Sequence, residues 1–124
     1  MIIDFKILFT IILSISLLDF VYLNLVKNNF NSMIIKIQNQ SIRLNLLGVL
    51  LTYFFLIFGV YYLVVVKQFN VTDMFIMGIL IYGIYELTNV SIFNDWSWFI
   101  VILDTLWGGI LFATVTYIVT NFLQ

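Results

Sequence analysis

Three acidic residues, Asp19, Glu86 and Asp104, lie inside long apolar stretches of the sequence. A carboxylate in hydrocarbon is costly, so such residues tend to face the protein interior or a water-filled cavity. Neighbouring carboxylates disfavour joint ionisation, so one member of a close group can hold a proton at neutral pH. Such a group can bind a proton or a small cation, or perform acid/base chemistry on a substrate. The structural alternative is that the acids accept hydrogen bonds and fix the register of the helices.

Four apolar runs position these acids, and they cover residues 5–26, 42–66, 71–93 and 98–122. A helix needs about 20 apolar residues to span the hydrocarbon core. β-branched residues are common in these runs, but an open sheet edge cannot exist in lipid and four strands cannot close a barrel. The sequence therefore predicts an all-α membrane protein with a single domain. Because the connections are short, the expected fold is an antiparallel four-helix transmembrane bundle.

The composition supports the same class and excludes several others. Of the 124 residues, 64% are hydrophobic and 9% are charged, whereas a soluble domain has about 25% charged residues. The lipid bilayer is therefore the expected partner of most of the surface. The chain has no cysteine and no histidine, which excludes disulfides and thiol or imidazole metal sites. We expect no cofactor and no metal, and the net charge of -1 offers no basic surface for nucleic acid.

The polar segment 27–41 connects the first two runs, and its amphipathic middle is typical of a short interfacial helix. We call the membrane side that bears this segment the distal side. It carries Lys27, Lys36 and Arg43, whereas the opposite side carries Lys6 and Lys67. The positive-inside rule therefore predicts a cytoplasmic first loop. Both termini should lie together on the other side, because four crossings are an even number.

The three acids are expected at one depth. With a rise of about 1.5 Å per residue, Asp19 lies about 10 Å below the distal surface, and Glu86 and Asp104 about 9 Å below it. Spacings of three, four and seven residues place further polar side chains on the faces that carry the acids. These candidates are Tyr82, Tyr85 and Asn89 around Glu86, and Trp107 beside Asp104. Arg43, at the start of the second run, is the expected counter-ion of an otherwise electronegative pocket.

Small residues are interpreted as packing positions rather than as a site. Gly109 and Ala113 form a small-xxx-small pair, a pattern that permits close helix contact in membranes. Gly78 and Gly83 are assigned the same role.

Short motifs in three of the runs resemble those of a known family. Residues 82–89, YGIYELTN, are similar to the YxxYDLTN signature of the family called domain of unknown function 2177. Residues 103–108, LDTLWG, resemble its D-x-x-W-G motif, and residues 18–22, LDFVY, resemble its LDxxW element with Tyr22 in place of tryptophan. Glu86 stands where the family usually has aspartate. The resemblance implies a four-helix, bacterial-type membrane protein and no established activity.

The acid layer supports three hypotheses about function. The first is transport or permeation of a small cation or of a proton-coupled solute. The second is an intramembrane enzyme that acts on a lipid-like substrate, with Glu86 and Asp104 as acid and base and Tyr82 or Tyr85 placing the substrate. The third is a structural or assembly subunit. Four helices are few for a complete transport path, so a homo-oligomer is expected under the first hypothesis.

Overall fold

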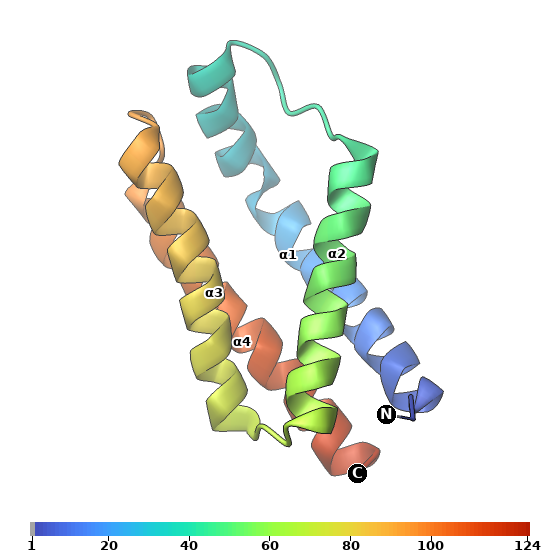
Figure 1. The fold of residues 1–124 in the computed structure, drawn as a ribbon. Coiled ribbons are helices and arrows are strands. Elements are labelled where there is room, and N and C mark those ends of the chain that lie inside the picture. Colours follow the sequence, from blue (N-terminus) through green and yellow to red (C-terminus); the bar gives the residue numbers. More distant parts are fainter. Residues whose placement is uncertain (1) are drawn as a thin grey trace.

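The computed structural model describes residues 2–124, and its helices are labelled in Figure 1. The chain forms α1 (Phe5–Gln38), α2 (Leu46–Tyr61), α3 (Val71–Ile92) and α4 (Trp98–Phe122). Each is long and apolar enough to cross a membrane, α2 together with the short π-helix η1 (Tyr62–Val66) that continues it. The prediction of a four-helix membrane protein is confirmed.

Side-chain caps fix where the four α-helices begin, and the Asp4 side chain caps α1 by accepting a hydrogen bond from the Ile7 backbone N–H. The Asn70 side chain accepts a hydrogen bond from the Asp73 backbone N–H, and the Asp73 side chain accepts one from the Asn70 backbone N–H. Asn45 and Ser97 cap α2 and α4 in the same way, each through a side-chain oxygen. These bonds satisfy N–H groups that have no partner within the helix. The start predicted for α3 at residue 71 and that for α4 at residue 98 agree with the structure.

The first helix is longer than expected. It does not end near residue 26 but continues to Gln38, where Asn39 adopts a left-handed conformation with φ of 60° and closes the helix. Its 34 residues extend over about 51 Å, which exceeds the roughly 30 Å of the hydrocarbon core. Residues 27–38, called here the α1 extension, are therefore helical as part of α1 and do not form a separate interfacial helix. The second helix correspondingly begins at Leu46, four residues later than residue 42.

The α1 extension is held by a contact that the sequence pattern does not reveal. Met33 is buried against Trp96 and Ile100, which lie at and beyond the turn between α3 and α4. The Ser97 backbone N–H also donates a hydrogen bond to the Met33 sulfur at 3.2 Å. The Phe30 ring meets the Trp96 ring edge-on, with centroids 5.8 Å apart. Tertiary packing thus keeps a polar segment helical.

The two ends of the bundle differ in what fills them. The N- and C-termini lie together at one end, beside the α2–α3 connection, and the other two connections lie at the distal end (Figure 1). The half that contains the termini is filled by a core of mostly aliphatic side chains. This core contains Ile7, Ile11, Ile15, Val60, Val64, Met74, Leu111, Phe112, Val115 and Val119. The acids lie between this core and the distal end.

Candidate functional site

Asp19 joins three helices through its carboxyl group. It lies on α1 and is 8% exposed. One of its oxygens accepts a hydrogen bond from the Tyr53 hydroxyl of α2. The other accepts one from Nε1 of Trp107, on α4, at 3.1 Å. One carboxyl group thus links α1 to both α2 and α4.

Asp104 repeats this arrangement with the helices exchanged. Its carboxyl, on α4, accepts a hydrogen bond from the Tyr22 hydroxyl of α1. Tyr22 follows Asp19 by three residues on α1, and Trp107 follows Asp104 by three residues on α4. Each helix therefore supplies one acid and one aromatic donor, and each acid is bound by the donor of the other helix. The Tyr22 and Trp107 rings stack between the two acids, with centroids 4.6 Å apart and an interplanar angle of 4°.

Glu86 is the most deeply buried of the three acids, with 0% of its surface exposed. Its Oε2 accepts a hydrogen bond from Nε1 of Trp96 at 2.7 Å. Its Oε1 has no hydrogen-bond partner among the described residues. The Glu86 and Asp104 carboxyls are close enough for a hydrogen bond when one of them carries a proton. The structure therefore places the half-buried Asp104 carboxyl beside the buried Glu86 carboxyl, one oxygen of which has no donor among the described residues.

Not every predicted site residue joins the three acids. Tyr82 is buried for most of its surface and meets Phe112 edge-on, so it packs within the interface between α3 and α4. Tyr85 is 57% exposed and lies on the outer surface of α3. Asn89 is turned inward, and its Nδ2 is buried without a hydrogen-bond partner among the described residues. Arg43 lies exposed in the segment between α1 and α2, away from the donors that bind the acids.

Aromatic donors take the place expected for a basic counter-ion. Tyr22, Tyr53, Trp96 and Trp107 supply the hydrogen bonds that the structure shows to the three acids. Of these, the sequence reasoning singled out only Trp107 as part of the site. Trp96 directly precedes the fourth span, a position where tryptophan is typical of the membrane interface, but its side chain is buried at 7% exposure. Tyr53 carried one available signal, a phenol hydroxyl in an otherwise apolar run.

The model of one protein family matches nearly the whole chain. The model of the family described as "Predicted membrane protein (DUF2177)" matches residues 4–121. The chain belongs to this family. No curated protein and no solved structure matches it. In this DUF2177 protein, the acids of the three resembling motifs, Asp19, Glu86 and Asp104, are the acids that the aromatic donors bind.

Proposed function

We propose that this membrane protein mediates transport or permeation linked to protons, and that the Glu86 and Asp104 carboxyls form its proton-binding pair. The observation that carries the proposal is the buried Glu86 Oε1, which has no donor among the described residues, on a carboxyl that lies beside the Asp104 carboxyl. A buried acceptor without a partner is costly. A proton shared between the two carboxyls removes that cost and the repulsion between two adjacent charges.

The surroundings of the pair support access from the distal side. The core in the half of the bundle that contains the termini is mostly aliphatic. Two hydroxyls buried there are already engaged close by: that of Thr116 donates to the Phe112 carbonyl of its own helix, and that of Tyr61 accepts a hydrogen bond from the Asp4 backbone N–H. On the distal side, Trp96 donates a hydrogen bond to Glu86, and the α1 extension packs on Trp96 through a few side chains. Movement of these two elements would open the carboxyl pair to water. Intramembrane acids in such positions are typical of proton and ion pathways.

We further propose that the distal side is cytoplasmic and that the transporting unit is a homo-oligomer. Three basic residues lie on the distal side, Lys27, Lys36 and Arg43, against two on the other side, and the positive-inside rule follows this difference. The natural chain has no cysteine, so single cysteines introduced at Gln40 and at Gln68 can be labelled from one side. Labelling of Gln68→Cys, but not Gln40→Cys, from outside intact cells is expected.

The proton-binding pair can be tested by infrared spectroscopy of the purified protein in lipid. A protonated carboxylic acid gives a carbonyl stretch that an ionised carboxylate lacks. This band is expected in the natural protein at neutral pH and should disappear in the Glu86→Gln variant. The Asp73→Asn variant is the matched control, since Asp73 caps α3 at the opposite membrane side and its amide analogue can still accept that hydrogen bond. A spectrum without the band in the natural protein would contradict the proposed proton sharing.

The transport function is tested separately in vesicles. A pH-sensitive dye enclosed in proteoliposomes reports proton entry when a potassium diffusion potential is imposed. The natural protein and the Asp73→Asn control should admit protons faster than vesicles without protein, whereas Glu86→Gln and Asp104→Asn should fall to the protein-free rate. The proposal fails if both variants, reconstituted in equal folded amounts, keep the full rate. It also fails if the natural protein admits protons no faster than empty vesicles.

A further inference from the structure

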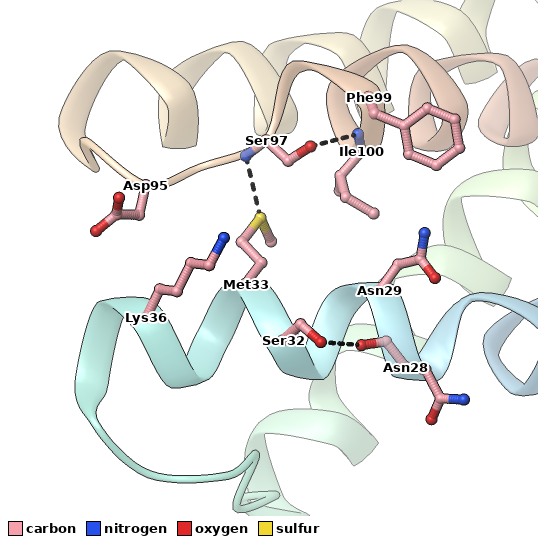
Figure 2. A pocket seen from close by; sticks show the side chains of 9 residues that line it. All are labelled: Asn28, Asn29, Ser32, Met33, Lys36, Asp95, Ser97, Phe99 and Ile100. Atoms are coloured by element: carbon pink, nitrogen blue, oxygen red, sulfur yellow. Dashed lines mark hydrogen bonds between the residues drawn. The ribbon is translucent and has the colours of Figure 1, made fainter.

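A polar groove lies outside the acid network, between the α1 extension and the beginning of α4 (Figure 2). It is open on one side and has a volume of about 370 Å³. Its lining consists of Asn28, Asn29, Ser32, Met33, Lys36, Asp95, Ser97, Phe99 and Ile100. None of these residues binds the three acids, so the groove is a separate feature of the distal end.

The groove carries one charge of each sign. The Lys36 ammonium points into the space between α1 and α4, with Asp95 near the mouth on the opposite wall (Figure 2). The Asn29 amide also points into this space, whereas the Asn28 amide points away from it (Figure 2). The first turn of α4 begins at Trp98 and adds the positive end of a helix dipole. The lining therefore favours an anion beside Lys36 and a cation beside Asp95.

The position of the groove along the membrane normal matches that of lipid headgroups. The groove lies where α4 begins, and the neighbouring Trp98 is 62% exposed. Exposed tryptophan at the end of a span is typical of the membrane interface. Phe99 and Ile100 form an apolar wall of the groove and continue into the span. The lining of the groove thus changes from charged and polar side chains to apolar ones toward the span. A ligand with a charged head and an apolar tail matches this change.

We propose that the groove binds the headgroup of a zwitterionic phospholipid that carries a phosphate and a primary ammonium, as in phosphoethanolamine. The phosphate lies beside Lys36 and the beginning of α4, where donors and positive charge converge. The ammonium lies beside Asp95 and donates hydrogen bonds to its carboxylate. A quaternary ammonium has no N–H group to donate, and a headgroup without an ammonium leaves Asp95 facing a phosphate. Both are therefore bound more weakly than the primary amine.

Native mass spectrometry of the detergent-purified full chain tests this assignment, because it counts the lipids that remain bound. Phosphatidylethanolamine is compared with phosphatidylcholine and phosphatidylglycerol of the same acyl chains. We expect phosphatidylethanolamine to bind more tightly, and Lys36→Gln to weaken its binding by about three- to fivefold, as for the loss of one partly exposed ion pair. Asp95→Asn should reduce the preference for phosphatidylethanolamine over phosphatidylglycerol. Lys67→Gln, at the opposite membrane side, is the matched control and should change neither value.

Two outcomes would overturn the proposal. One is equal binding of the three lipids by the natural protein. The other is unchanged binding in both Lys36→Gln and Asp95→Asn. Soluble phosphoethanolamine distinguishes a lipid site from a site for a free phosphate ester. It should displace the lipid only at much higher concentration, because it lacks acyl chains. If it binds as tightly as the lipid, the groove takes a soluble ligand and the lipid assignment is wrong.

Discussion

Helix α3 meets α4 by close backbone packing, whereas α1 meets α2 and α4 at the acid layer through hydrogen bonds from aromatic donors to carboxylates. At the first contact, a Cβ atom added to Gly78 would lie 2.1 Å from the Gly108 carbonyl oxygen. At the second, Asp19 accepts hydrogen bonds from Tyr53 and Trp107. Lipid supplies no hydrophobic driving force between helices, so packing and interhelical hydrogen bonds must supply it. In this protein, close backbone packing joins α3 to α4, and interhelical hydrogen bonds join α1 to α2 and α4 at the acid layer.

The difference assigns different roles to the two regions. A contact between backbones has no side chain that can rotate away, so the α3–α4 pair forms a rigid unit. At the acid layer, by contrast, α1 is joined to α2 and α4 by a small number of polar side chains. The α1 extension packs on the α3–α4 turn through a few apolar side chains, among them Met33 and Phe30. The Glu86 and Asp104 carboxyls belong to the α3–α4 unit, while the α1 extension that packs on Trp96 belongs to the other region. Under the proposed function, this division would let the α1 extension move while the two carboxyls stay in place.

The largest effect is expected from Gly78→Ala, which adds one methyl group to the α3–α4 contact. That methyl would also lie 2.8 Å from the Gly109 Cα, so the two backbones must separate. Overpacking in a tight core costs about 1–3 kcal/mol or more, and we expect about 3 kcal/mol here because backbone atoms are involved. Unfolding titrations in mixed micelles measure the loss. Gly59→Ala is the control, since no atom lies within 4 Å of its added Cβ, and equal stability of the two variants would contradict the rigid contact.

The next effect concerns the hydrogen bond that holds Glu86. Trp96→Phe removes the donor at 2.7 Å while keeping an aromatic ring against Phe30. Oε2 of Glu86 then loses its donor, and a buried polar atom without a partner costs about 1–3 kcal/mol. We expect a loss near 2 kcal/mol in the same titration. Trp98→Phe, at a 62% exposed tryptophan, should cost far less, and a Trp96→Phe variant as stable as that control would show that the bond contributes little.

A smaller loss is expected at the contact between α1 and α2. Tyr53→Phe removes the hydroxyl that donates to Asp19, but Asp19 keeps its bond from Trp107. The expected cost is therefore about 1 kcal/mol. The control is Tyr62→Phe, which removes the hydroxyl of a tyrosine that lies 37% exposed in η1. A double-mutant cycle that combines Tyr53→Phe with Asp19→Asn measures the interaction energy between these two side chains. A coupling energy of zero would mean that their hydrogen bond does not stabilise the contact between α1 and α2.

The sequence predicted the four membrane-spanning helices, because the length of an apolar run depends on local composition. Run lengths set the helices, and the helix rise placed Asp19 and Asp104 at similar depths, where the structure links them through the Tyr22–Trp107 stack. Gly78 was also interpreted correctly as a close packing position.

The α1 extension and the aromatic donors were not predictable in the same way. Residues 27–38 are polar, and they remain helical because Met33 packs on a turn more than 60 residues later. The burial of Trp96 depends on the same contact, so a tryptophan beside a span looked like an interface anchor. Arg43 was chosen because opposite charges attract, but the carboxyls of this structure accept their hydrogen bonds from phenol and indole groups. Such partners can be assigned only when the tertiary contacts are known.

The smallest effect is expected from Gly83→Ala, which tests how far along α3 the tight contact extends. Its added Cβ would lie 3.4 Å from the Thr105 Cγ2, a side-chain contact that a small adjustment accommodates. Alanine also favours a helix over glycine by about 1 kcal/mol in water, so the two contributions nearly cancel and the stability should change by less than about 0.5 kcal/mol. Gly78→Ala and Gly83→Ala place the same methyl group on one helix, one and a half turns apart. A large loss at both positions would mean that α3 and α4 are equally tight along this length, and that the rigid contact is not confined to the crossing at Gly78.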